Sequence, residues 1–245
     1  MPNKNYTIIA FEGLDCSFKE TNYKSFVNHL KEMRDPSGFN IITESFPRYT
    51  HPSCYSVEQW LGNNYDRNIL KSHPMAVDSL YSIDRFDFWY YKDNSGDITD
   101  YRWIDIVDGK HGTDRFTYFI FDRYNLSNTI YNQIYSGIDI RDFTFDNDVY
   151  AIPNPDIIIW MRMRSFDTLL NLLAEKKNKD ANELDIDFLR GVWERSEQII
   201  HSNIFNELGI KLIVVDCLNE DNTIKSRQDI SDFIWNSVCQ SVKYF

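Results

Sequence analysis

Short apolar runs alternate with stretches of helical periodicity along the chain, and this alternation restricts it to few folds. Runs that are apolar on both faces and rich in β-branched and aromatic residues are typical of buried parallel strands. We predict strands at 6–11 (YTIIAF), 116–121 (FTYFIF) and 156–163 (DIIIWMRM), and two more at 39–46 and 210–217. Helices are predicted between them, at 19–34, 56–71, 74–91, 125–136, 165–177, 185–207 and 226–243. This order predicts an α/β protein in which βα units surround a parallel sheet.

The length and one polar stretch define the expected domain organisation. A chain of 245 residues can bury a full core as one domain, so we expect a single domain over 1–245. Residues 92–115 interrupt the alternation and contain several turn formers, which indicates an insertion. Within it, Trp103, Ile104, Ile106 and Val107 indicate a short hairpin.

The composition disfavours several classes of protein. With 26 Lys plus Arg against 37 Asp plus Glu, the formal charge is −11, which disfavours nucleic acid or anionic lipid as the main partner. The four cysteines are scattered without a zinc-binding spacing, so we expect a reduced, cytoplasmic chain. The apolar run before Glu12 is too short for a signal peptide, and no stretch is long enough to span a bilayer.

The stretch FEGLDCSFKET (11–21) follows the first predicted strand and leads into a helix. Backbone N–H groups and the positive helix end make this the place for a phosphate-binding loop. Of the pattern G-x-x-x-x-G-K-[ST], only Gly13 and Lys19 match, because Phe18 replaces the second glycine and Glu20 replaces the metal-binding hydroxyl. An ordinary strand-turn-helix remains the alternative. The candidate phosphate-binding residues are Gly13, Cys16, Ser17, Phe18, Lys19, Glu20 and Thr21.

Phe18 and Glu20 are the two departures that bear most on chemistry. Glycine is favoured at the Phe18 position because the backbone there takes torsions that a β-carbon resists. Phe18 would adopt them at a cost on the order of 1–3 kcal/mol unless the loop is reshaped. Glu20 offers oxygen to a hard cation such as Mg²⁺, but it adds negative charge beside a nucleotide.

Asp122 and Arg123 close the predicted strand at 116–121. Side chains at such ends project at the carboxyl edge of the sheet, where open α/β folds bind ligands. There an arginine can fork onto phosphate oxygens, and a carboxylate can orient Mg²⁺ or its waters. A salt-bridged pair that caps the strand is the alternative.

Five stretches together resemble a known family. They are FEGLDCSFKET, FPRYTHP (46–52), YSIDRFDFW (81–89), FDRYNLSNTIYN (121–132) and IPNPDIIIWMRM (152–163). In this order they resemble the motifs of thymidylate kinases, and the resemblance spans roughly residues 6 to 217. It implies a three-layer P-loop kinase fold with five parallel strands, a homodimer, ATP and Mg²⁺ as cofactors, and a nucleoside monophosphate as substrate.

The resemblance also implies roles for individual residues. Tyr81 would stack on the base and Arg85 would bond its carbonyl, while Tyr131 and Asn132 would lie against the deoxyribose and base. Asp15 would bind the region of the sugar 3′-hydroxyl. Packing inside the helices is the alternative for the two tyrosines, and a turn-forming role is the alternative for Asp15. Catalysis would rest on Lys19, Asp15, Asp122 and Arg123, with Glu20 and Asp122 as metal ligands.

Two further expectations concern the phosphates. Phe46 and Arg48 are both candidate substrate-binding residues. Arg48, beside Pro47, is the candidate for the acceptor phosphate, although the family's basic residue usually falls slightly later, where this chain has Tyr49. The lid-like segment 174–187 contains Lys176, Lys177 and Lys179 but no arginine. We take Lys177 as a donor-phosphate ligand, with a solvated helix end as the alternative.

Three hypotheses about function follow. The first is transfer of a phosphoryl group from ATP to a pyrimidine deoxynucleoside monophosphate, most simply dTMP. The second is a nucleotide-binding protein that has lost catalysis, because the departures at Phe18, at Glu20 and in the lid all fall on the donor side. The third is a kinase for dUMP or for a modified pyrimidine deoxynucleotide.

Overall fold

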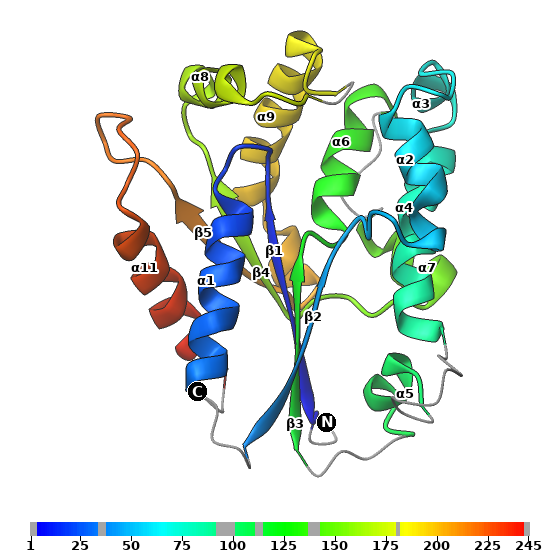
Figure 1. The fold of residues 1–245 in the computed structure, drawn as a ribbon, viewed down its shortest axis with the longest axis vertical. Helices are drawn as coiled ribbons and strands as arrows, with labels where there is room; N and C mark the ends of the chain where they lie inside the picture. Colours follow the sequence, from blue (N-terminus) through cyan, green and yellow to red (C-terminus); the bar gives the residue numbers. More distant parts are fainter. Residues whose placement is uncertain are drawn as a thin grey trace.

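The computed structural model describes residues 4–33, 38–91, 101–110, 115–136, 143–179 and 182–242. A five-stranded sheet in the order β2-β3-β1-β4-β5 lies at its centre, and each neighbouring pair of strands is parallel (Figure 1). The predicted α/β class and parallel sheet are therefore confirmed. The strands are β1 (Tyr6–Gly13), β2 (Phe39–Ser45), β3 (Phe116–Asp122), β4 (Ile157–Arg162) and β5 (Lys211–Asp216).

Helices cover both faces of the sheet. In Figure 1, α1 and α11 lie on one side, and α4 and α6 lie on the other. Most predicted helices are present within a few residues of their expected ends. They are α1 (Lys19–Glu32), α4 (Pro74–Tyr90), α6 (Leu126–Ser136), α8 (Phe166–Glu175) and α11 (Arg227–Cys239).

Two predicted helices are each divided. The segment 56–71 forms α2 (Tyr55–Leu61) and α3 (Ile69–Ser72), because Gly62 ends the first helix and Asn63 takes a left-handed φ of 61°. The segment 185–207 forms α9 (Ile186–Ile200) and α10 (Ile204–Glu207). The short helices η1 (Pro52–Cys54) and α7 (Phe145–Tyr150) were not predicted.

The hairpin prediction within the insertion was wrong. Residues 103–107 form helix α5 (Trp103–Val107), whose first turn is closed by reciprocal bonds between Arg102 and Asp105. Ile104 and Ile106 are buried in a cluster with the aromatic residues of α4. Tertiary packing thus selected the helix over the β-propensity of this stretch. The flanking parts of the predicted insertion, 92–100 and 111–114, lie outside the described residues.

The alternation of side chains along β1 divides the core into two layers. Ile9 and Phe11 pack with the residues of α1, whereas Ile8 and Ala10 pack with Trp89 of α4. Trp89 is fully buried, as expected for a core residue, and donates from Nε1 to the Tyr124 hydroxyl at 2.7 Å. Within the described residues, no helix is both long and apolar enough to cross a bilayer.

The chain order places two loops at one edge of the sheet. β1 and β3 are neighbours, and both run towards the same edge, where β1 leads into α1 and β3 leads into α6. In the sheet, β3 and β2 lie on one side of β1, whereas β4 and β5 lie on the other side. The strand order therefore reverses its direction at β1. Such a change of direction opens a crevice beyond the strand ends, which is where open α/β sheets bind ligands.

A buried carboxylate ties these two loops together. Glu12, near the end of β1, is fully buried. Its oxygens accept from the backbone N–H groups of Tyr124, Leu126 and Ser127 at 3.0, 3.0 and 3.2 Å, and from the Ser127 hydroxyl. These N–H groups belong to the turn after β3 and to the first turn of α6, where a negative charge is favoured.

Replacement of Glu12 by alanine should therefore destabilise the fold. It would leave three buried N–H groups without a partner, and each such group costs about 1–3 kcal/mol. We expect Glu12→Ala to lower the free energy of unfolding by roughly 3 kcal/mol or more in urea titrations. Glu32→Ala, at the exposed end of α1, is the control and should change it by less than about 0.5 kcal/mol. A loss below about 1 kcal/mol in Glu12→Ala would show that Glu12 does not hold this turn.

Candidate active site

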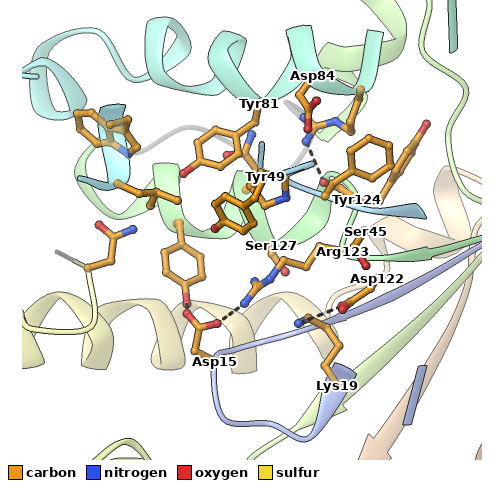
Figure 2. Close-up of a pocket in the computed structure, with 18 of the residues that line it drawn as sticks. Asp15, Lys19, Ser45, Tyr49, Tyr81, Asp84, Asp122, Arg123, Tyr124 and Ser127 are labelled. Atoms are coloured by element: carbon orange, nitrogen blue, oxygen red, sulfur yellow. Dashed lines mark hydrogen bonds and ion pairs between the residues drawn. The ribbon is translucent and has the colours of Figure 1, made fainter. Parts of the chain in front are cut away.

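A cavity of about 420 Å³ opens at the carboxyl edge of the sheet, within the usual range for a small-molecule site. Figure 2 shows side chains from the loop after β1, from the end of β3 and from α4 and α6 around it. One end is charged and the other is largely aromatic. The lining residues are Asp15, Lys19, Glu20, Ser45, Phe46, Pro47, Tyr49, Trp60, Leu61, Tyr81, Asp84, Arg85, Asp122, Arg123, Tyr124, Ser127, Asn128, Tyr131, Asn132, Lys176, Asn182 and Phe188.

The loop after β1 holds two of its non-glycine residues in left-handed backbone conformations. Phe18 caps α1 in the left-handed conformation, with φ 59° and ψ 17°, and Cys16 also has φ 59°. The loop is therefore not reshaped to relieve Phe18. Gly13 has φ 152°, and a β-carbon there would lie 2.7 Å from Ser17 Oγ and 2.8 Å from the Met161 carbonyl oxygen. Gly13 is thus the one position in this loop where no side chain fits.

The other loop residues differ in their burial and in what they contact. Ser17 is buried and donates from Oγ to the Leu14 carbonyl at 2.7 Å, so its hydroxyl supports the loop. Cys16 is half-buried, and burial raises the pKa of its thiol. Phe18 packs its ring against the main core cluster. Thr21 is exposed and does not line the cavity.

Two ion pairs form the charged end of the cavity (Figure 2). Lys19 Nζ lies 3.2 Å from Asp122 Oδ1, and both side chains are mostly buried. Burial lowers the pKa of Lys19, and the charge of Arg123 adds to this effect, while Asp122 and Asp15 oppose it. The Arg123 guanidinium pairs with Asp15, which also accepts from the Tyr131 hydroxyl at 3.2 Å.

Arg123 is held in an unusual backbone conformation. Its φ is 64°, and its N–H donates to the Phe11 carbonyl at 2.8 Å. A left-handed non-glycine residue of this kind costs free energy and is often found at functional sites. Burial alone would lower the pKa of Arg123, but Asp15 raises it well above its ordinary value, so the guanidinium stays charged. Burial likewise opposes the lowering of the Asp15 pKa, yet Arg123, Lys19 and Lys176 together hold it below its ordinary value.

The aromatic end of the cavity carries the predicted base-binding residues. Tyr81 and Arg85, one helical turn apart on α4, both line it, as do Tyr131 and Asn132 of α6. Arg85 is only 2% exposed, and its Nε donates to Asp146 at 2.5 Å. The predicted pair on α4 is therefore brought together at one cavity.

Arg48 does not reach the cavity, so the structure does not support it as a phosphate ligand. Its Nε donates to Asp84 Oδ1 at 2.9 Å, and its NH2 group contacts Asp87 Oδ2 at 2.7 Å and Ser53 Oγ at 2.8 Å. Tyr49, the next residue, lines the cavity instead. The guanidinium of Arg48 thus neutralises the buried Asp84 and the partly exposed Asp87.

Lys177 and Glu20 are also placed differently from the prediction. Lys177 is exposed and lies outside the cavity lining, whereas its neighbour Lys176 lines the cavity and pairs with the buried Glu183 at 2.5 Å. Glu20 reaches the rim of the cavity, but its carboxylate pairs with Lys24 at 2.5 Å on the exposed face of α1. We therefore omit Lys177 and Glu20 from the ligands proposed below.

Several lining residues were not predicted. Asn128 and Ser127 lie inside the motif FDRYNLSNTIYN, and the helical spacing from Asn128 to Asn132 would have placed these two residues on one face of α6. Trp60 and Phe188 come from segments that carry no chemical motif, and Asn182 comes from the lid-like segment 174–187 but was not among its predicted ligands. Only the folded chain brings those three to the cavity.

The residues present fit a magnesium ion at Asp122. Among the described residues, no group of three or more His, Cys, Asp or Glu side chains could hold a metal by itself. Mg²⁺ in phosphoryl-transfer sites, however, typically needs one or two carboxylates, with water and substrate phosphates completing its shell. Asp122 is the one buried carboxylate at this end of the described cavity that could serve in this way, and its Oδ1 already pairs with Lys19 Nζ at 3.2 Å. A metal bound to Asp122 would therefore share this carboxylate with Lys19.

Comparison with solved structures identifies the fold. The chain matches a thymidylate kinase from Candida albicans with a TM-score of 0.60 and 16% identity, over 96% of this chain and 92% of that one. The chain has the thymidylate kinase fold. A thymidylate kinase from Ehrlichia chaffeensis matches with a TM-score of 0.59 and 15% identity, over 96% of this chain and 98% of that one.

Sequence comparison adds nothing to this likeness, since no family model and no curated protein matches the chain. The predicted thymidylate kinase fold, a three-layer P-loop architecture, is nevertheless confirmed by the structural match.

The strain at Phe18 leads to a prediction about stability. Glycine takes the left-handed conformation freely, whereas alanine keeps the strain and loses the ring, so Phe18→Gly should be more stable than Phe18→Ala by on the order of 1 kcal/mol. Thr21 on the same helix is the matched control, because there glycine should be less stable than alanine by about 1 kcal/mol. Urea unfolding of the four variants measures both differences. If alanine were the more stable variant at position 18 as well as at position 21, a left-handed Phe18 would be contradicted.

The Asp15–Arg123 pair leads to a prediction about pH. The folded-state pKa of Asp15 is lowered, so its stabilisation is present above the unfolded pKa of about 3.9 and is lost as pH falls through the folded value. Unfolding free energies from pH 6 to pH 3 should therefore fall more steeply for the wild type than for Asp15→Asn. Parallel curves would show that the pair does not depend on the charge of Asp15.

Proposed function

We propose that this protein transfers the γ-phosphoryl group of ATP to a pyrimidine deoxynucleoside monophosphate, in the simplest case dTMP. The observation that carries the proposal is one cavity with two chemically different ends. Lys19, Asp122 and Arg123 lie at the end beside the phosphate-binding loop, and Tyr81 and Arg85 lie at the other. The thymidylate kinase fold supports a nucleoside monophosphate kinase.

The charged end has the groups that this reaction requires. An oxygen of the acceptor phosphate would form a bond to the γ-phosphorus while the bond to the β-phosphate oxygen breaks, and ADP would leave with that electron pair. The acceptor oxygen is already ionised, so no strong general base is needed. Lys19 would neutralise donor phosphate, and Arg123 would align the acceptor phosphate with its guanidinium fork.

Asp122 would hold Mg²⁺ through its carboxylate, which also pairs with Lys19. When bound, Mg²⁺ neutralises phosphate charge and orients the donor. The remaining positioning would come from the chain itself. Asp15 keeps Arg123 in place through the ion pair, and the Tyr131 hydroxyl fixes the second carboxylate oxygen of Asp15 at 3.2 Å.

The aromatic end suits a flat pyrimidine ring. Tyr81 would stack on the base, and Arg85 would donate to a base carbonyl. Tyr131 would lie against the sugar and exclude a bulky 2′ substituent, and Asn132 would lie beside it. dUMP and modified pyrimidine deoxynucleotides share the same ring edge and belong to the same proposal. We extend it to a homodimer in the cytoplasm, by resemblance to thymidylate kinases.

A nucleotide-binding protein without catalysis is the second candidate. The donor side of the site favours this second candidate. Glu20 occupies the position of the usual metal-binding Ser or Thr, and its carboxylate is paired with Lys24. Lys176 of the lid-like segment is likewise paired, with Glu183. Calorimetry distinguishes the candidates, because a protein of this kind should bind dTMP but show negligible affinity for ATP with Mg²⁺.

The test of the kinase proposal is a coupled assay of ADP release with ATP and a panel of nucleoside monophosphates. We expect turnover with dTMP or another pyrimidine deoxynucleotide. Arg123→Ala should lower kcat/KM by on the order of 10³-fold or more, because it removes a cation that stabilises developing charge. Arg227→Ala, at the exposed start of α11, is the control and should keep full activity. Undiminished turnover in Arg123→Ala would remove Arg123 from the mechanism.

A further inference from the structure

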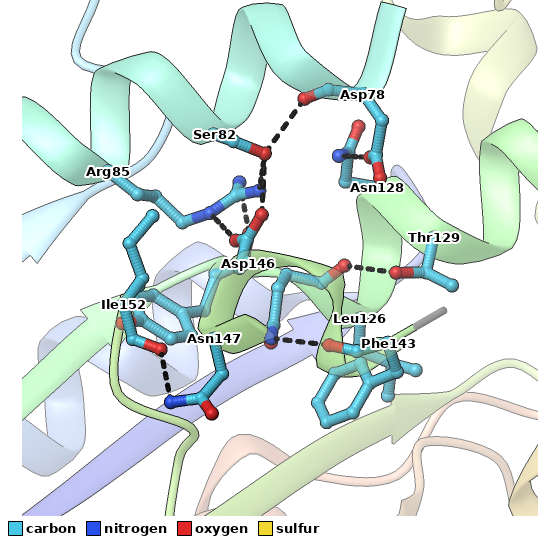
Figure 3. Close-up of polar contacts among 12 residues, drawn as sticks. Asp78, Ser82, Arg85, Leu126, Asn128, Thr129, Phe143, Asp146, Asn147 and Ile152 are labelled. Carbon is cyan, nitrogen blue, oxygen red and sulfur yellow. Dashed lines mark hydrogen bonds and ion pairs between the residues drawn. The ribbon is translucent and has the colours of Figure 1, made fainter. Parts of the chain in front are cut away.

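Residues behind the lining hold the walls of the cavity in place. On the side of α4, Arg85 pairs with the buried Asp146 (Figure 3). On the side of α6, Asn128 donates to the buried Asp78. The wall formed by α2 and by the segment before α9 is held by a cation instead. There Arg67, which is half-buried and does not line the cavity, contacts residues of both segments.

Arg67 contacts Trp60 through both the face and the edge of its guanidinium. The guanidinium carbon lies 3.9 Å from the centroid of the Trp60 ring, and the NH1 group donates to the Trp60 carbonyl at 3.2 Å. Trp60 lines the cavity, although it is only 2% exposed. Because tryptophan gives the strongest cation–π contact, Arg67 restrains the orientation of this wall residue.

The same guanidinium bonds Asn182, which lies 115 residues further along the chain. The NH2 group of Arg67 donates to Asn182 Oδ1, and Asn182 is a buried residue that also lines the cavity. Arginine is suited to this double contact, because its planar fork donates at the edges while its face packs on a ring. A lysine is a compact point charge and cannot make both contacts in this way.

Asn182 in turn leads into α9. The Asp185 N–H donates to the Asn182 carbonyl at 3.3 Å, and the Asp185 carboxylate caps α9 by accepting from the Phe188 N–H at 3.0 Å. Phe188 lines the cavity and packs against Tyr131, with 5.9 Å between the ring centroids. A short series of contacts therefore runs from Arg67 to an aromatic residue of the cavity wall.

The two segments that Arg67 joins lie on either side of α6 (Figure 1). Arg67 lies two residues before α3, and Asn182 lies four residues before α9. Helix α6 packs against both α3 and α9. Because α2, α6 and α9 all contribute lining residues, the bond from Arg67 to Asn182 helps to close the cavity around its aromatic end.

We propose that Arg67 is a positioning residue that retains the nucleotide by joining Trp60 to Asn182. A wall fixed by bonds within the protein need not be ordered by the ligand, and this preorganisation increases affinity. Small-molecule sites also depend on enclosing most of the surface of the ligand. The inference rests on the proposed function, since it assumes that a pyrimidine nucleotide occupies this cavity.

A double-mutant cycle on dTMP binding tests the inference. Arg67→Met keeps the length of the side chain but removes the fork, and Asn182→Ala removes the acceptor. In calorimetric titrations, each single variant should bind dTMP about tenfold more weakly than the wild type. The double variant should also lose only about tenfold, because both changes remove the same bond. Effects that multiply to about 100-fold would show that the two residues act independently, and this would overturn the inference.

Arg67→Lys separates the charge from the fork. It keeps a cation beside Trp60, so it disturbs the fold least, but it should still bind dTMP at least about fivefold more weakly than the wild type. Arg227→Met, at the exposed start of α11, is the matched control and should leave the affinity for dTMP unchanged. Wild-type affinity in Arg67→Lys or in Arg67→Met would overturn the inference, since a purely structural role alters stability and not the affinity of the folded protein.

Amide hydrogen exchange examines the bond to Asn182 without a nucleotide. Exchange at the Asp185 N–H should be at least about tenfold faster in Arg67→Lys than in the wild type, because its acceptor is the Asn182 carbonyl. The Leu169 N–H of α8, which donates to the Ser165 carbonyl at 3.1 Å, should exchange at the same rate in both proteins. An unchanged rate at Asp185 would overturn the claim that Arg67 positions Asn182.

The outcomes distinguish this inference from the proposed function. If the wild type binds none of dTMP, dUMP and dCMP, the proposed function fails, and the retention of a nucleotide by Arg67 fails with it. If the wild type binds dTMP and the substitutions of Arg67 leave that binding unchanged, only the role of Arg67 is overturned.

Discussion

The bonds from Glu12 to the first turn of α6 are the interaction on which the candidate site depends. One carboxylate satisfies three backbone N–H groups and a hydroxyl, and in doing so joins the end of β1 to the turn after β3. Asp15 follows Glu12 by three residues, and Arg123 immediately precedes Tyr124, whose N–H is one of the donors. The spacing of Asp15 and Arg123, and hence the charged end of the cavity, is therefore set by a group that does not line the cavity.

In the loop after β1, the backbone conformation and the side-chain chemistry follow the phosphate-binding pattern to different extents. Its backbone keeps Phe18 in the left-handed torsions that glycine adopts most easily. Its side chains have changed, since Glu20 stands where a metal-binding hydroxyl is usual and pairs with Lys24. The shape is maintained by the surrounding fold at the expense of local strain. Retention of the shape and loss of the hydroxyl lead to the two competing proposals about donor binding.

Charge pairing explains which of the predicted site residues line the cavity and which do not. Lys19, Asp122, Arg123 and Asp15 come from segments that end at the same sheet edge, so topology alone predicts their meeting. Arg48 has the right residue type and lies near the right strand. Two carboxylates of α4, Asp84 and Asp87, engage its guanidinium. No local pattern reveals that competition, because the partners lie 36 and 39 residues away.

The sequence by itself determined the five strands, their parallel pairing and the edge at which the loops meet, because hydrophobic periodicity and strand-helix order are local properties that constrain topology strongly. Only the tertiary structure decided the helix at 103–107, the left-handed conformation of Phe18, and the ion pair between Arg85 and Asp146. Each of these depends on a partner distant in sequence: the aromatic residues of α4, the core against which Phe18 packs, and the buried Asp146. Burial makes such contacts strong, since an unsatisfied charge or polar group inside the protein is costly.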